Sequence, residues 1–469
     1  MLTFDPNFSV KNFLSALDYT ILVVILVLHG LVILYSQRNQ HQKSSANLAT
    51  RQKFALPLFV TSLTVAWYGK FFYVTQTAFE NGLYNFYTQG IFWYVAYALF
   101  AFYLIKKIRV YNAASLTALI RKMYGDKSTN IAAVLVVIKA LPITYLISLM
   151  LALHMFMNIS MWAIAILVLS WLIFAAINDG TRTDMYSNII HFICVIAAVG
   201  SVLIFAVIKW GGLSFLYAKL PASYFQPYGT HSSLDMLVWF GLAISTTFIS
   251  PIFYQHCLAA DSERTAKLGV IICIVFWILI DICTTSGAMY AKAIFPNAEP
   301  FTAYGMLVSS LLPAGLRGLF VAGIIGTIIP SISACLSIIK ATIHDELLAI
   351  THYSKSNILG IILAVTLLLI VLFNGAFASI LIVKNCFAGF LFIPIVIGVY
   401  APGLITSGVL FLSVISSGIA MGIWYLCGMQ EILKIDLIVI GCVASFLVYA
   451  YSYYRANTNN LCNTMYSEN

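Results

Sequence analysis

Apolar stretches, each about as long as an α-helix needs to cross a bilayer, follow one another along this sequence. Only 9% of the residues are charged, and 61% are hydrophobic. Lipid offers a backbone amide no hydrogen-bond partner, so such stretches cross the membrane as helices that satisfy their own amides. The pattern therefore predicts an all-α, polytopic membrane protein whose surroundings are the lipid bilayer.

We predict about 13 transmembrane helices. The connectors between them are too short to hold a catalytic domain, so the chain is expected to form one membrane domain. The predicted spans, with approximate ends, are residues 18–36, 54–79, 86–105, 131–153, 161–177, 189–208, 234–253, 268–290, 317–341, 358–376, 381–400, 405–426 and 436–453.

The formal net charge of +9 arises mainly from Lys and Arg beside the ends of the predicted spans. This placement indicates membrane topology, with the more basic side in the cytoplasm, and it argues against a nucleic-acid partner. The basic charge and the lack of an organellar targeting pattern fit a bacterial inner membrane.

The sequence lacks the signatures of common enzymes and of ATP-driven pumps. It contains no Gly-rich phosphate-binding loop before Lys-Ser/Thr, no Gly-x-Ser-x-Gly and no His-Glu-x-x-His. Its nine cysteines stand singly and form no metal-ligand pattern, so we predict neither an enzyme nor a bound cofactor. Secondary transport of a small organic solute, coupled to Na⁺ or H⁺, is the leading hypothesis.

Two predicted spans contain residues that weaken a helix. Gly69 lies near the middle of span 54–79, and Ser250-Pro251 lies in span 234–253. In many transporters an interrupted helix exposes carbonyls and amides to the bound solute or ion. The weakened spans are five spans apart, which predicts two five-helix repeats of inverted topology. The expected parts are residues 1–53 (an extra helix and loop), 54–208 (first repeat), 209–404 (second repeat) and 405–469 (two helices and a short tail).

Several motifs resemble, in order and spacing, those of the sodium/solute symporter family, whose members carry proline, pantothenate, sugars and carboxylates. The resemblance covers roughly residues 40–345 and implies a leucine-transporter-type fold. His256 stands where the family has an arginine. The motifs are FYQHCLAAD at 253–261, AKLG at 266–269, AWYG at 66–69, ENGL at 80–83, KKIR at 106–109, YG at 124–125, LPAGLRGLF at 312–320 and IHD at 343–345.

The resemblance implies a sodium site at the weak point of span 54–79. Carried over by motif, its ligands are the carbonyls of Val65, Tyr68 and Thr327 and the hydroxyl of Ser331. Pro330 stands where the family has a second hydroxyl. Because a hard cation prefers several oxygen ligands, we expect this loss to weaken sodium binding.

Two further departures concern the ion. The family has Thr-Asp-x-x-Gln on the sodium exit route, whereas residues 187–191 read SNIIH, so the carboxylate has become the amide of Asn188. Asp184, one turn earlier, either compensates for this loss or merely caps a helix. The segment 336–345 is one residue shorter than the family pattern, which leaves Ser333 as an alternative to Ser331.

Lys70 stands directly after Gly69, where the family has a small residue. A charge near the bilayer centre costs about 2.5–3.5 kcal/mol, so this lysine needs a partner or a function. One hypothesis is that its ammonium replaces or borders the sodium ion, or titrates as the site of proton coupling. The alternative is a structural ion pair with Asp281, for which Lys139 is a second possible partner.

In this architecture the solute lies beside the first broken helix. The aromatic and amide side chains there suit solute binding, although each of them also suits helix packing. A solute sensor that does not transport is the alternative function, but the tail after Tyr453 is too short for a signalling domain. The solute candidates are Trp67, Phe71, Gln76, Trp93, Tyr97 and Trp239.

Overall fold

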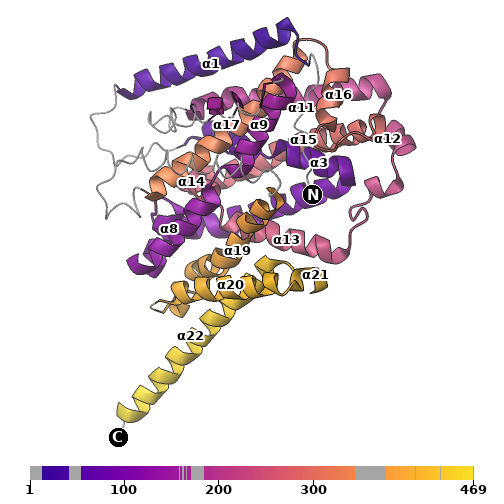
Figure 1. Ribbon diagram of the computed structural model, residues 1–469. Helices are drawn as coiled ribbons and strands as arrows, with labels where there is room; N and C mark the ends of the chain where they lie inside the picture. The colour runs from indigo at the N-terminus through magenta and orange to yellow at the C-terminus, as the bar shows by residue number, and fades with distance from the viewer. Residues whose placement is uncertain are drawn as a thin grey trace.

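The computed structural model describes residues 13–41, 54–157, 159–160, 163–164, 166–168, 170, 184–343, 377–406, 408–433 and 435–467. Figure 1 shows a bundle of helices, with α1 along one side and the C-terminal α22 projecting from the other. Its longer helices are α1 (Ala16–His41), α2 (Leu56–Trp67), α3 (Phe71–Asn81), α5 (Phe92–Leu99), α7 (Leu116–Tyr124), α8 (Asp126–Ala140), α9 (Ile143–Met157), α11 (Asp184–Trp210), α13 (Ser233–Phe248), α14 (Pro251–Ala259), α15 (Glu263–Ile294), α16 (Ala303–Leu311), α17 (Leu316–Thr342), α19 (Phe377–Tyr400), α20 (Val409–Leu426) and α22 (Leu437–Ser467). Shorter elements are α4 (Leu83–Asn85), η1 (Phe86–Ile91), η2 (Phe100–Leu104), α6 (Ile105–Val110), α12 (Leu213–Lys219), η4 (Ala222–Phe225), η6 (Pro402–Leu404) and α21 (Met429–Leu433).

Helices of membrane-spanning length dominate the described part of the chain. Seven are long and apolar enough to cross a bilayer, and the bent pair α13 and α14 raises this number to eight. Shorter apolar helices cover Ala16–Val32, Leu56–Trp67 and Cys386–Tyr400. These helices coincide with the predicted spans, except that 358–376 and most of 161–177 lie outside the described residues. The protein is therefore the predicted helical, multi-pass membrane protein.

The first weak point is a true break in the structure. α2 ends at Trp67, the amide of Tyr68 donates back to the carbonyl of Val65 at 3.2 Å, and α3 begins only at Phe71. Gly69 allows the break to lie directly against α17. A β-carbon at this position would lie 2.8 Å from the β-carbon of Ser331 on α17. The backbone between the half-helices is thus pressed against a neighbouring helix.

The second weak point is also a break. α13 ends at Phe248 and α14 begins at Pro251, with a bend of 47° between them. Proline has no amide hydrogen and its ring displaces the preceding turn, so a continuous helix is disfavoured at this position. The prediction that spans 54–79 and 234–253 are interrupted is confirmed.

A third interruption was not predicted. Span 131–153 consists of α8 and α9, separated by Leu141 and Pro142. The proline lacks the amide that would continue α8, which explains where the helix stops. Lys139 and Ala140 therefore lie at the end of a helix and not in the middle of one.

Glycines on one side of α17 let two helices approach it closely. A β-carbon on Gly323 would lie 2.8 Å from the β-carbon of Ala198, and one on Gly326 would lie 2.5 Å from the Nδ1 of His191, both on α11. A β-carbon on Gly318 would lie 2.7 Å from the α-carbon of Asp18 on α1. Small residues of this kind allow backbones to pack tightly in membranes, where no hydrophobic effect draws helices together.

Hydrogen bonds join the amino end of α2 to the carboxyl end of α14. The amide of Phe54, just before α2, donates to the carbonyl of Ala259 at 2.8 Å, and the amide of Asp261 donates to the carbonyl of Phe54 at 3.1 Å. Arg109 donates to the carbonyls of Cys257 and Ala260 at 2.7 and 3.1 Å. Arg109 thus satisfies carbonyls at the carboxyl end of α14, close to His256.

The C-terminal helices pack on one another. The hydroxyls of Ser413 on α20 and Ser445 on α22 lie 2.6 Å apart, and Ser417 donates to the carbonyl of Gly441 at 2.9 Å. The division of the chain at residues 53, 208 and 404 into an extra helix, two inverted repeats and a C-terminal pair stays a prediction, which the matched breaks support.

Candidate functional site

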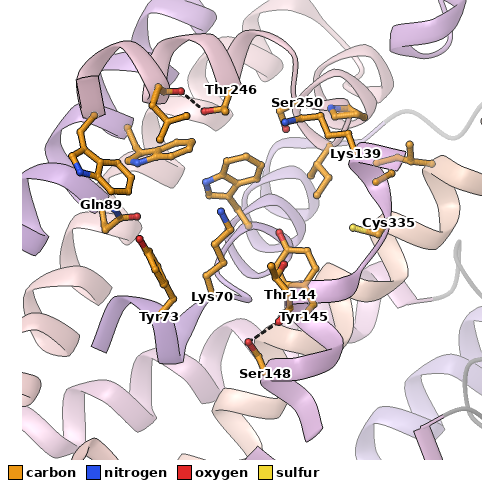
Figure 2. A pocket seen from close by; sticks show the side chains of 18 residues that line it. Lys70, Tyr73, Gln89, Lys139, Thr144, Tyr145, Ser148, Thr246, Ser250 and Cys335 are labelled. Carbon is orange, nitrogen blue, oxygen red and sulfur yellow. Dashed lines mark hydrogen bonds between the residues drawn. The ribbon is translucent and has the colours of Figure 1, made fainter. Parts of the chain in front are cut away.

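A cavity of about 140 Å³ lies between the two broken helices. Figure 2 shows Lys70 reaching into it, with Tyr73 on one side and Thr144 and Tyr145 on the other. The break in α2 and α3 supplies one wall and the break in α13 and α14 supplies another. The described lining residues are Trp67, Lys70, Tyr73, Gln89, Trp93, Lys139, Ala140, Thr144, Tyr145, Ser148, Trp239, Leu242, Thr246, Ser250, Pro251, Ile252, Cys335 and Ile338.

The residues expected to bind the ion gather at the first break. Val65 and Tyr68 close the end of α2, and Ser331 lies against Gly69. The hydroxyl of Ser331 donates to the carbonyl of Thr327 at 2.8 Å, and both residues are fully buried. The break after α2 and the hydrogen-bonded pair Thr327–Ser331 of α17 are therefore neighbours at Gly69. Backbone carbonyls and hydroxyls are ligands that a hard cation prefers.

Pro330 lies inside α17, directly before Ser331. It offers no hydroxyl, and without an amide hydrogen it leaves the carbonyl of Gly326, four residues earlier, without its helical donor. The helix therefore offers no side-chain oxygen at this position and one carbonyl that is not committed to the helix. Ser333, the alternative to Ser331, is also buried.

Asn188 faces α2 from α11. Its amide nitrogen donates to the hydroxyl of Ser62 at 3.2 Å, and its buried oxygen has no hydrogen-bond partner among the described residues. One turn further on, the Nε2 of His191 lies 3.0 Å from the Nδ1 of His29 on α1. Asp184 begins α11, but its side chain lies outside the described residues. Asn188 thus connects α11 to the first broken helix.

Lys70 and Asp281 point to different places. The Nζ of Lys70 lies 5.8 Å from the centre of the Trp93 ring, inside the cavity. The carboxylate of Asp281 on α15 accepts one hydrogen bond from Tyr68 at 2.8 Å and another from Tyr94. The buried acid is therefore held by two tyrosine hydroxyls, one of which belongs to the break in α2 and α3.

Three of the predicted solute residues line the cavity: Trp67, Trp93 and Trp239. Tyr97 supports them from behind, because its hydroxyl accepts a hydrogen bond from the indole of Trp67 and its ring lies 6.2 Å from that of Trp93. The hydrogen bond to Tyr97 thus orients the indole ring of Trp67 before any solute is bound.

Phe71 and Gln76 lie elsewhere. Phe71 is 1% exposed and packs edge-on against Phe72, Tyr304 and Phe320 in the helix core. The amide of Gln76 donates to Glu80 at 3.2 Å, one turn further along α3. Neither residue is among those that line the cavity. The step of one residue from Lys70 to Phe71 rotates the side-chain direction by about 100° around the helix axis, away from the cavity.

Sequence reasoning missed one whole wall of the cavity. Lys139, Thr144, Tyr145 and Ser148 come from α8 and α9, on either side of their interruption. Pro142 was the available signal, because a proline in a predicted span marks a probable end of a helix. Gln89, which was not predicted as a site residue either, lies in the π-helix η1. Short π-helical turns are often found at functional sites.

The lining can bind a solute through ammonium, amide, hydroxyl and indole groups. In the part of the chain that the structure describes, no three His, Cys, Asp or Glu side chains come together in a way that would hold a metal ion.

The architecture is similar to that of a known transporter. A solved structure of a Na⁺-coupled sialic acid symporter, in a substrate-bound outward-open state that reveals a novel Na⁺ site, matches with a TM-score of 0.73 at 16% sequence identity. The match covers 94% of this chain and 97% of that chain. No protein-family model matches the sequence, and no curated protein matches it. The chain therefore has the fold of a Na⁺-coupled symporter, as its motifs predicted.

Proposed function

We propose that this protein is a secondary active transporter that moves a small organic solute across the membrane by alternating access. The observation that carries the proposal is the cavity between the two broken helices, lined from both of them. Transporters of this architecture bind their solute at such interruptions and expose it to one side of the membrane at a time. The shared fold of the sialic acid symporter supports this function, but fold alone does not define the solute.

Ion coupling takes place, in this proposal, at the break in α2 and α3. Na⁺ would be held by the carbonyls of Val65, Tyr68 and Thr327 and by the hydroxyl of Ser331. The contact of Ser331 with Gly69 supports this assignment. With Pro330 in place of a hydroxyl residue, the site has fewer ligands and a weaker affinity for Na⁺.

Proton coupling through Lys70 is the second candidate. Its side chain lies in the cavity beside the same break, so a change in its protonation would act on the solute directly. An ammonium that loses its proton in one state of the transport cycle would replace the movement of a sodium ion.

Transport is tested in two steps with the purified protein. A thermal-stability screen against amino acids, carboxylates, sugars and vitamins, with and without Na⁺, first identifies a solute, because a ligand of the folded state raises its apparent stability. Uptake of that solute into proteoliposomes is then measured under imposed Na⁺ and pH gradients. We expect accumulation that depends on one of the gradients.

A matched pair of variants links uptake to the cavity. Trp239→Ala removes a cavity wall and is expected to reduce uptake at least about tenfold, the scale of a lost binding contact. Trp424→Ala makes the same change on α20, where the indole donates to the carbonyl of Ile435, and should leave uptake within about twofold. Solute binding without any uptake would instead identify a sensor.

A further inference from the structure

Asp281 places a carboxyl group inside a membrane-spanning helix. It lies in α15, which is long and apolar enough to cross the bilayer, and the residue is only 6% exposed. No described residue forms an ion pair with it, and its two oxygens accept hydrogen bonds from the hydroxyls of Tyr68 and Tyr94. Ionisable groups at this depth are costly and rare, and in transporters they mark ion pathways and proton relays. The position of Asp281 therefore calls for a functional explanation.

The titratable groups that face Asp281 are tyrosines. Tyr68 comes from the break between α2 and α3, and Tyr94 and Tyr97 come from α5. Tyr304 of α16 lies close to Tyr68. From the other elements packed against α15, no described acid or base makes a hydrogen bond or an ion pair with Asp281. Because a tyrosine loses its proton only in alkaline solution, a change of charge in this cluster near neutral pH is a change at Asp281.

The hydroxyl of Tyr68 connects the carboxyl group to a second hydroxyl. The Tyr68 oxygen lies 2.8 Å from the Oδ1 of Asp281 and 2.9 Å from the Oγ1 of Thr284. Thr284 lies one turn further along α15 and donates to the carbonyl of Ile280 at 2.9 Å. A continuous chain of hydrogen bonds of normal length thus runs from the carboxyl group to a backbone carbonyl.

This chain is satisfied with the carboxyl group in either protonation state. When the acid is ionised, Tyr68 donates to Oδ1 and both oxygens of Asp281 accept. When Oδ1 carries a proton, it donates to Tyr68, whose own hydrogen turns to the Oγ1 of Thr284. Tyr94 donates to Oδ2 in both states. Neither state therefore leaves one of these buried groups without a partner, which would cost free energy.

Tyr68 and Tyr94 also connect the carboxyl group to the walls of the cavity. Tyr68 is the residue at which α2 ends, directly after the cavity residue Trp67, and Tyr94 directly follows the cavity residue Trp93. Asp281 itself is not among the described residues that line the cavity. A proton on Asp281 thus reverses a hydrogen bond at the break, while burial separates that proton from the water of the cavity in this state.

We propose that Asp281 is the proton-binding site through which solute movement is coupled to a proton gradient. This inference rests on the proposed function and names the residue at which its coupling proton binds. The proton binds to Oδ1 of the carboxylate, turns the hydroxyl of Tyr68 towards Thr284, and leaves again when the acid ionises. Coupling at this site requires no change of charge at Lys70.

Infrared spectroscopy of the purified protein tests proton binding without any solute. A protonated carboxyl group has a carbonyl stretch that a carboxylate lacks, and exposed acids are largely ionised above about pH 5.5. We expect a carboxyl band that disappears as the pH rises from about 5.5 to 9. Asp281→Asn should lack the band, whereas Asp126→Asn, which replaces an exposed acid, should keep it.

Tyr68→Phe tests the chain of hydrogen bonds. Without the tyrosine hydroxyl, the proton on Asp281 loses its acceptor, so the carboxyl band should move to higher frequency, because fewer hydrogen bonds weaken its C=O bond. Tyr217→Phe, on an exposed ring, is the matched control and should leave the band in place. Tyr68→Phe keeps the acid, so it tests the proposal even if Asp281→Asn does not fold.

Coupling is measured with the solute that the stability screen identifies. In proteoliposomes without a membrane potential, with the acid side outside, we expect accumulation of up to about tenfold per pH unit for one proton per solute molecule. Asp281→Asn keeps the position neutral at every pH, so it should not accumulate the solute, and any exchange that it retains should be independent of pH. Asp126→Asn should accumulate within about twofold of the parent.

Three results would overturn the proposal: no carboxyl band of Asp281 that changes between about pH 5.5 and 9, no accumulation under a pH gradient in a parent that transports, and accumulation that survives in Asp281→Asn. Uptake driven by Na⁺ alone, without a titrating Asp281, rejects the proton site and leaves the transporter intact. A titrating Asp281 in a protein without uptake rejects transport and keeps the proton-binding site.

Discussion

The backbone of Gly69 touches the side chain of Ser331, so that a β-carbon on residue 69 would lie 2.8 Å from the β-carbon of the serine. Real β-carbons essentially never approach other atoms so closely. The contact joins the break in α2 and α3 to the middle of α17, and through it the proposed ion site is assembled from two helices.

Gly69→Ala is expected to displace the break. Overpacking of a tight contact typically costs about 1–3 kcal/mol, and here it would also separate Ser331 from the carbonyls of α2. We expect a lower apparent melting temperature in detergent and loss of transport. The double variant with Ser331→Gly should recover part of the stability. Gly241→Ala is the control, because its β-carbon would meet nothing within 4 Å; an equal loss in both variants would refute the steric explanation.

Asp18→Asn tests how α1 is held to α17. The carboxylate of Asp18 accepts hydrogen bonds from the amides of Gly315 and Gly318, at 2.7 and 2.8 Å, at the amino end of α17. An anion at this position also interacts favourably with the helix dipole, so we expect a loss of about 1–2 kcal/mol in stability. Asp126→Asn, which loses an exposed pair with Arg121 and a charge at the start of α8, should cost less than about 1 kcal/mol. Thermal unfolding in detergent compares them.

Tyr68→Phe removes a hydrogen bond from the buried carboxyl of Asp281. Removing one donor to a buried acid is expected to cost about 1–3 kcal/mol, whereas Tyr217→Phe on an exposed ring should cost almost nothing. Tyr68→Phe and Asp281→Ala should be non-additive when combined, since both changes remove the same contact. Additive losses in apparent stability would mean that the hydrogen bond does not couple the break to α15.

Pro330→Ser restores the hydroxyl that the ion site lacks. We expect Na⁺, compared with choline, to raise the apparent melting temperature more in this variant than in the parent, because the ion gains an oxygen ligand. Adding Ser331→Ala should abolish the gain. Pro394→Ser is the matched control, because it also replaces a proline inside a helix, α19, away from the site. A similar response to Na⁺ in both proline variants would argue against an ion site at residue 330.

The sequence by itself determined the membrane class, the approximate spans and two of the three interruptions. These features depend on residues that are neighbours in the chain: runs of apolar side chains specify helices in lipid, and Gly69 and Pro251 act on the backbone where they stand. The order of the motifs was also sufficient to predict the fold that the sialic acid symporter shares.

Only the tertiary structure decided which side chains meet. Phe71 and Lys70 are adjacent in sequence, yet one packs in the aromatic core and the other lines the cavity. Asp281, a plausible partner for either lysine, accepts hydrogen bonds from Tyr68 and Tyr94 instead, and Lys139 joins the cavity from α8. The physical reason is that the rotation of each helix about its axis, and the neighbour that it meets, follow from packing between distant segments, about which the local apolar pattern carries little information.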